Sequence, residues 1–329
     1  MRPFDYRRES DPAAAVAAVA ADPGAAFLGG GTNLVDHLKL GIAAPTALVD
    51  VSRLDTGGVE RLPAGGLRIG ASLSNADLAA HPAVRSEYPV LASAVLSGAS
   101  AQIRNLATTA GNLLQRTRCV YFQDATAPCN KRAPGTGCPA RDGHDRYNAV
   151  FGTSGECVAV HPSDMAVALA ALDARVRLLG PEGERTVPVT GLYRDPGAEP
   201  QRDTVLGHGE LVTAVDVPAL PMAARSAYRK VRDRASYAFA LVSVAAAIAT
   251  EDGVVTGARI AFGGLAHGPL RARRAEEALI GAPAVEESFR AAGRAETAGA
   301  ETGPGTAAKP AMAVGALAAV LRELTSEET

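Results

Sequence analysis

The sequence predicts an α+β fold in three parts, with a long irregular insert in the second part. The 329 residues are enough for two or three domains, and 47% of them are hydrophobic, so a sizeable core can be buried. Short strands alternate with helices early in the chain, whereas a run of longer strands followed by helices closes it. We therefore expect a first lobe at 1–55, a second lobe at 56–217 and a C-terminal α+β domain with an antiparallel sheet at 218–329.

Charge and hydropathy disfavour two broad classes of function. The chain carries 33 basic and 35 acidic side chains, so it lacks the basic surface that a nucleic-acid partner requires. No apolar run reaches the length of about 18 residues that a membrane span needs. The alanine-rich segment at 12–20 follows acidic residues and matches no signal peptide. We expect a cytoplasmic protein, which would reach the periplasm only if it were exported with a partner.

Helix caps and glycines define the elements of the first lobe. Asp11-Pro12 is typical of a helix start, and Pro23-Gly24 ends that helix. Gly41 closes a second, shorter helix. The predicted elements are a helix beginning at 12, strands at 25–28 and 46–51, a helix at 33–40, and a hairpin around 63–66.

Periodic patterns continue through the second lobe and the C-terminal domain, apart from one interruption. From about 115 to 158 the apolar periodicity vanishes, and a structureless segment of this length in a compact protein is usually functional or disordered. Gly253 predicts a tight turn between two strands of a meander. The predicted helices are 74–80, 90–98, 164–174, 275–279, 285–295 and 312–324, and the predicted strands are 175–179, 185–188, 227–231, 240–250 and 254–262.

A glycine-rich turn between a strand and a helix is the first candidate binding site. Glycines allow the backbone to approach an anion and to turn its N–H groups toward it. The turn is neither a G-x-G-x-x-G fingerprint nor a Walker loop, and on its own it could equally be a turn that binds nothing. Its candidate phosphate-binding residues are Leu28, Gly29, Gly30, Gly31, Thr32, Asn33 and Leu34.

A second stretch of small hydroxyl and amide residues, at 103–113, follows a predicted helix. Two separate donor-rich loops suit a diphosphate held between two lobes. The candidate residues of this second loop are Thr108, Thr109, Gly111, Asn112 and Leu113.

The two loops together resemble the flavin diphosphate loops of the FAD-binding medium subunits of xanthine dehydrogenase-like molybdenum enzymes. Ser163-Asp164 looks like that family's Ser-Asp pair, and the stretch 228–236 resembles the Lys-x-Arg…Ser stretch that opens its C-terminal domain. The resemblance implies a two-lobed FAD-binding domain of the vanillyl-alcohol-oxidase-like, PCMH type. It also implies that Asp164 hydrogen-bonds FAD and that Lys230 places a charge near the flavin. One departure is Ala110, where many members of the family have a second glycine.

Four cysteines, the chain's entire complement, lie within the irregular insert: Cys119, Cys129, Cys138 and Cys157. Their gaps of nine, eight and eighteen residues match neither zinc-ribbon nor ferredoxin spacing. Spacing alone leaves a metal site, disulfides and free thiols open, and ligation by sulfur only would suit either iron–sulfur or zinc. The local sequence resembles the insert of the FAD subunits of periplasmic-type aldehyde oxidoreductases, which implies a [4Fe-4S] cluster.

The resemblance implies an oxidoreductase subunit that carries electrons and has no catalytic residues for the substrate. Its partners would be a large subunit with the molybdenum cofactor and a small subunit with two [2Fe-2S] clusters, whose electrons reach FAD and then an acceptor. Two alternatives remain open. One is a free-standing FAD oxidoreductase of the vanillyl-alcohol-oxidase type, and the other is a zinc-stabilised interaction protein without enzymatic activity.

For the remaining polar residues near these sites, we expect structural positions or a role in charge compensation. We expect His37 on the surface of the short helix that follows the first loop, and His144 and His161 as polar loop residues. The basic residues of the insert would either be solvated or compensate the negative charge of a cluster. They are Arg116, Arg118, Lys131, Arg132 and Arg141.

Overall fold

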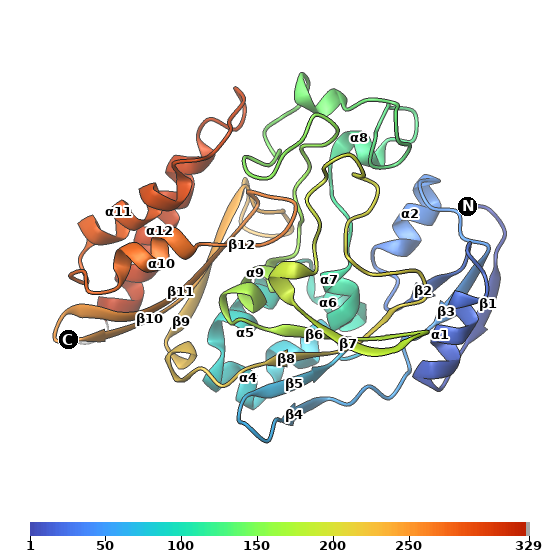
Figure 1. The fold of residues 1–329 in the computed structure, drawn as a ribbon, viewed down its shortest axis with the longest axis horizontal. Helices are drawn as coiled ribbons and strands as arrows, with labels where there is room; N and C mark the ends of the chain where they lie inside the picture. Colours follow the sequence, from blue (N-terminus) through green and yellow to red (C-terminus); the bar gives the residue numbers. More distant parts are fainter. Residues whose placement is uncertain (327–329) are drawn as a thin grey trace.

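The structure is a computed structural model that describes residues 1–326, and it contains three separate β-sheets (Figure 1). The first sheet is parallel, in the order β1-β3-β2. Its strands are β1 (Asp5–Arg8), β2 (Ala26–Leu28) and β3 (Ala47–Asp50), accompanied by helices α1 (Pro12–Ala20) and α2 (Leu34–Leu40).

The predicted helix boundaries of the first lobe are confirmed. The Asp11 side chain caps α1 by accepting a hydrogen bond of 2.8 Å from the N–H of Ala14, and Pro12 occupies the first turn. Gly41 ends α2 in the left-handed region, at φ +74°. Strand β1 was not predicted, because all four of its residues are exposed and mostly charged, which leaves no apolar alternation to detect.

The second sheet is antiparallel throughout, in the order β4-β5-β8-β6-β7. The predicted hairpin is confirmed, since β4 and β5 are joined through Gly65 and Gly66, both at positive φ. The five strands of this second sheet are β4 (Val59–Arg61), β5 (Leu67–Gly70), β6 (Arg175–Gly180), β7 (Gly183–Pro188) and β8 (Leu211–Val217). The helices of this region are α3 (Asn75–Ala80), α4 (Pro82–Glu87), α5 (Pro89–Ser97), α6 (Ala101–Leu106), α7 (Thr109–Leu113) and α9 (Asp164–Ala171).

The third sheet is an antiparallel meander in the order β12-β11-β10-β9. Asp252 and Gly253, both at positive φ, form the predicted tight turn between its two long strands. The strands are β9 (Ser226–Val231), β10 (Val242–Glu251), β11 (Val254–Gly263) and β12 (Leu270–Arg271). Helices α10 (Arg273–Leu279), α11 (Glu286–Thr297) and α12 (Lys309–Ser326) pack together beside this sheet (Figure 1).

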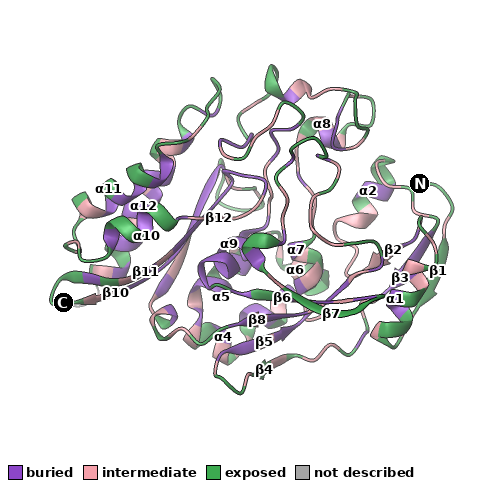
Figure 2. Cartoon of the chain, viewed as in Figure 1, coloured by how far each residue is buried: buried purple, intermediate pink, exposed green. Residues whose placement is uncertain are grey.

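Helix α9 joins the second and third regions, because all of its residues are buried (Figure 2). It packs against α5 on one side and against β10 and β11 on the other. The insert lies above these elements as an irregular segment with one short helix, α8 (Val120–Gln123), and a 3-10 turn at Pro139–Arg141. Short 3-10 turns also occur at Val189–Gly191 and Pro221–Ala224. Within residues 1–326, no helix has the length and apolar character of a membrane span.

Candidate functional site

Two adjoining cavities lie where the lobes, the insert and the C-terminal domain meet. The larger, about 660 Å³, is walled by α5, α6, α9, the insert and the segment that follows β9. The smaller, about 270 Å³, lies between the two loops that the sequence predicted as binding sites. Thr32, Asn33 and Gly111 line both, so the two cavities form one continuous site.

The first loop presents unused backbone donors to this site. Among residues 1–326, the N–H groups of Gly30, Gly31, Thr32 and Asn33 donate to no protein acceptor. Gly31 has φ +72°, a conformation that favours glycine. Leu28 lies at the end of β2, where it does not border either cavity, and the rest of the predicted first loop lines the smaller cavity.

Gly30 has a more specific role than anion approach. A Cβ atom at Gly30 would lie 1.8 Å from the carbonyl oxygen of Leu106, at the end of α6. The absence of a side chain therefore allows the first loop to lie directly against the segment that leads into the second loop. The strict need for glycine at this position comes from contact between the two lobes.

The second loop presents side chains, because its backbone donors are already engaged. The N–H groups of Thr109 and Ala110 donate to carbonyls of the segment between β5 and α3, and those of Gly111 and Asn112 donate to Thr108. The Thr108 hydroxyl also lies 3.1 Å from where a Cβ of Gly29 would be, which joins the two loops closely.

The predicted residues of the second loop divide into two groups. Thr108, Gly111 and Asn112 border the cavities. Thr109 and Leu113 are fully buried in the core, where the Thr109 hydroxyl donates to the carbonyl of Leu73 at 3.2 Å. The cofactor-binding roles of the loop residues stay predictions.

Asp164 and Lys230 meet in a buried ion pair at the wall of the larger cavity. The Lys230 Nζ lies 2.7 Å from Asp164 Oδ2, and the Tyr228 hydroxyl donates to Oδ1 at 2.5 Å. Ser163 caps α9 by accepting from the N–H of Ala166, which fixes Asp164 in the first turn. Burial raises the pKa of Tyr228 well above its ordinary value, so it remains a neutral donor.

Two histidines also belong to this region, and neither matches a simple surface position. The prediction that His37 is exposed was wrong: it is buried, and its ring meets that of Phe122 from the insert at 5.6 Å between centroids. Burial lowers the pKa of His37 to about 4. His161 lines the larger cavity and lies 3.1 Å from the carbonyl of Leu113, and burial lowers its pKa to about 4 as well. Both rings are therefore neutral at physiological pH.

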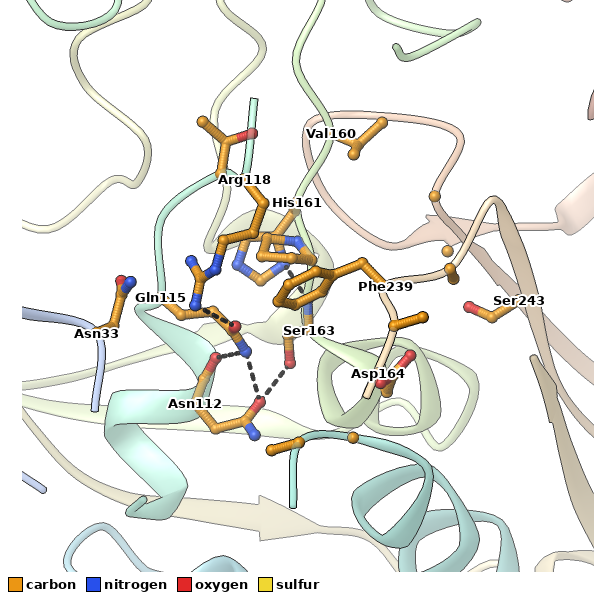
Figure 3. Close-up of a pocket in the computed structure, with 18 of the residues that line it drawn as sticks. Asn33, Asn112, Gln115, Arg118, Val160, His161, Ser163, Asp164, Phe239 and Ser243 are labelled. Atoms are coloured by element: carbon orange, nitrogen blue, oxygen red, sulfur yellow. Dashed lines mark hydrogen bonds between the residues drawn. The ribbon is translucent and has the colours of Figure 1, made fainter. Parts of the chain in front are cut away.

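Residues that the sequence reasoning did not select complete the wall of the larger cavity. Figure 3 shows Gln115, Arg118 and Phe239 around the same space as Asn112 of the second loop. The Asn112 amide oxygen accepts from the Ser163 hydroxyl at 2.6 Å and from the Gln115 amide at 3.2 Å. No local motif marks Gln115, Arg118 and Phe239, because these residues come together only when the insert folds over the lobes.

The four cysteines line one small cavity beneath α8. None forms a disulfide; Cys129 and Cys157 are buried, and Cys119 and Cys138 are half-buried. Burial raises the pKa of Cys157 to about 11, and it also raises the pKa of Cys119 and Cys138, so these thiols are protonated at neutral pH in the absence of a metal. Within residues 1–326, no three His, Cys, Asp or Glu side chains are grouped closely enough to bind a single metal ion.

The basic residues of the insert are mostly engaged in structure. Lys131 is buried, and its Nζ lies 2.5 Å from Asp203 and 2.7 Å from the carbonyl of Pro200. Burial alone would raise the pKa of Asp203, but Arg116 and Lys131 together hold that pKa below its ordinary value. Arg132 donates to the carbonyls of Tyr121 and Phe122 within α8. The prediction that the basic residues of the insert are solvated is therefore wrong for Arg116, Lys131 and Arg132.

The fold and the site agree with two family models that together cover nearly the whole chain. Residues 2–220 match the FAD binding domain in molybdopterin dehydrogenase, and residues 226–324 match the CO dehydrogenase flavoprotein C-terminal domain. The chain belongs to the family of FAD-binding subunits of the molybdenum hydroxylases, and it is a flavin-binding oxidoreductase subunit.

Individual relatives are consistent with this family. The chain is 52% identical to the aldehyde oxidoreductase FAD-binding subunit PaoB of Escherichia coli (strain K12), over 88% of this chain and 90% of that protein. It is 28% identical to the glyceraldehyde dehydrogenase medium chain of Sulfolobus acidocaldarius, over 77% of this chain and 73% of that protein. A solved structure of carbon monoxide dehydrogenase from Hydrogenophaga pseudoflava has a TM-score of 0.76, with 26% identity and 99% coverage of both chains. The expected α+β, two-lobed FAD-binding fold with its C-terminal domain is thus confirmed.

Proposed function

We propose that this chain transfers electrons within a molybdenum hydroxylase, with FAD in the two adjoining cavities and a [4Fe-4S] cluster on the four cysteines. The observation that carries the proposal is the row of unused N–H groups at 30–33, which faces the small hydroxyl and amide side chains of the second loop. Such a cradle of donors suits the diphosphate of FAD, whose negative charge needs hydrogen bonds when it leaves water.

The cavities divide the proposed site into a diphosphate region and a flavin region. The smaller cavity, between the loops, would hold the diphosphate, and the larger would hold the ring system. FAD supplies the electron-accepting chemistry, while the chain binds and orients it. Asp164 can still accept a hydrogen bond from FAD, because each carboxylate oxygen has more than one lone pair. Lys230, held by Asp164, would orient the polar edge of the cofactor.

Three observations support a cluster on the cysteines. All four thiols line one cavity, which suits a [4Fe-4S] cluster because each of its irons takes a different thiolate. None of the four cysteines forms a disulfide, so each thiol remains available as a ligand. Burial raises the pKa of Cys157 to about 11, and the positive charge of Lys131 opposes this rise, which reduces the cost of forming the thiolate that a cluster needs.

The two proposed cofactors would share a wall. Thr117, Cys119 and Ala159 line both the larger cavity and the cysteine cavity. Electrons could therefore pass between cluster and flavin over a short distance.

The proposed partners are a large subunit with the molybdenum cofactor and a small subunit with [2Fe-2S] clusters, in a heterotrimer or its dimer. The names of the relatives support this, since they are described as medium chains or FAD-binding subunits of larger enzymes. The similarity to PaoB makes an aldehyde the substrate class to test first. The proposed location is the cytoplasm, where thiols stay reduced and available as ligands.

An absorption spectrum combined with anaerobic iron and sulfide analysis tests this proposal. We expect flavin bands with a broad iron–sulfur shoulder, and about four irons and four sulfides per chain. Flavin bands alone would remove the cluster and favour a free-standing FAD oxidoreductase. Stoichiometric zinc without flavin or iron would favour an interaction protein and would contradict the proposal.

A further inference from the structure

The cations around the larger cavity differ in how far their charge is compensated. Lys230 forms an ion pair with Asp164 at 2.7 Å, so the pair carries no net charge. Arg104 is half-buried and turned toward the carbonyl of Gly98, to which it donates at 2.7 Å. Arg234 is exposed and folds back onto carbonyls of its own loop, where water and salt screen it.

Arg118 differs from Lys230 in having no ion pair and from Arg234 in being half-buried, and it differs from Arg104 in packing against an aromatic ring. It is half-buried in the cavity wall and forms no ion pair with any residue between 1 and 326. Its hydrogen bonds go to neutral acceptors, the carbonyl of Arg116 and the amide oxygen of Gln115. Burial lowers the pKa of Arg118, and Asp36, which also lines the cavity, partly opposes this shift. The arginine side chain remains protonated at neutral pH, so Arg118 places a positive charge without an ion-pair partner in the cavity wall.

The position of Arg118 is held from two separate parts of the chain. Its guanidinium lies 5.0 Å from the centroid of the Phe239 ring, which comes from the loop after β9 (Figure 3). Its backbone precedes Cys119, which lines both the larger cavity and the cysteine cavity. The ring covers one side of the cation, which reduces its screening by water.

From this geometry we infer that Arg118 is the cation that raises the reduction potential of the flavin. The inference rests on the proposed placement of the flavin ring in the larger cavity. A flavin that accepts electrons gains negative charge, and a fixed, poorly screened cation nearby stabilises the reduced form relative to the oxidised form. The Asp164–Lys230 pair then orients the cofactor, while Arg118 biases its electron affinity.

The test compares three variants of the complete heteromeric complex. R118Q removes the charge, R118K retains it, and R85Q removes an exposed arginine of α4 that borders neither cavity. The readouts are the FAD content and the flavin midpoint potential, measured by anaerobic spectroelectrochemical titration. These readouts separate a change of charge from a loss of fold, because the potential is measured on flavin that is still bound.

We expect R118Q to lower the ratio of reduced to oxidised flavin about tenfold at a fixed potential, which for a two-electron couple is a fall of about 30 mV. R118K and R85Q should keep the wild-type midpoint. A full FAD content with an unchanged midpoint in R118Q would overturn the inference. If R118Q loses its FAD, a second neutral variant, R118M, decides: a lowered midpoint supports the role of charge, and a wild-type midpoint overturns it. Wild-type complex without flavin would instead overturn the proposed function itself.

Discussion

Gly30→Ala is the substitution whose effect the structure defines most sharply. The added Cβ would lie 1.8 Å from the Leu106 carbonyl oxygen and 2.7 Å from the carbonyl carbon, and both are backbone atoms that cannot rotate away. To restore ordinary contacts, the first loop and the end of α6 must separate by roughly 1.5 Å. A displacement of about 1 Å at a binding site commonly costs one to two orders of magnitude in its function.

We therefore expect Gly30→Ala to weaken FAD binding at least about tenfold, which corresponds to about 1.4 kcal/mol. The assay is a titration of flavin-depleted protein with FAD, followed by quenching of flavin fluorescence. Gly29→Ala should have a smaller effect, because its Cβ would meet only the Thr108 hydroxyl at 3.1 Å. Gly58→Ala is the matched control, because its Cβ would enter open space and its φ is not positive.

The order of the three affinities is the decisive result. Wild-type FAD affinity in a folded Gly30→Ala variant would show that the cofactor does not lie between the two loops. Equal losses in Gly30→Ala and Gly58→Ala would show that the effect comes from general destabilisation. The thermal midpoint of each flavin-free protein separates these cases.

Three further predictions concern stability and the insert. Asp164→Ala should lower the free energy of unfolding by about 3 kcal/mol, because it leaves a buried cation unpaired; the double variant with Lys230→Met should recover part of this loss in denaturant unfolding, and a merely additive loss would argue against the pair. Acidification from pH 6.5 to 4 should lower the thermal midpoint, since His37 and His161 have folded-state pKa values of about 4, so the unfolded chain binds more protons in this window; a His37→Asn variant should show a weaker dependence on pH, and an unchanged dependence would exclude His37 as a cause. Cys138→Ser should remove iron and sulfide while some FAD remains bound, and full iron content in this variant would exclude it as a ligand.

Elements whose signals are local were predictable from the sequence. Asp11 and Gly41 mark helix ends through their own side-chain or backbone chemistry, and Gly253 marks a turn between neighbouring strands. The glycine-rich loop was likewise visible, because its conformational freedom is a property of the residues themselves.

Features that depend on distant contacts were not predictable in this way. Strand β8 pairs with β5 and β6, which lie far from it in the sequence, so no short-range pattern indicates its place. The burial of His37 arises because Phe122 of the insert covers α2. Arg118 faces Phe239 only after the insert and the C-terminal domain close over the same cavity. Hydrophobic periodicity identifies one helix or strand at a time and does not show which distant segments will contact each other.

In the proposed function, this chain receives electrons from partner subunits and passes them on through its flavin. Anaerobic addition of an aldehyde, with the flavin absorbance followed over time, tests it most directly. We expect the flavin of the complete complex to bleach, and the flavin of the chain purified alone to remain oxidised until a chemical reductant is added. Bleaching of the isolated, contaminant-free chain by aldehyde would show that it oxidises the substrate itself and would contradict the proposed electron-transfer role.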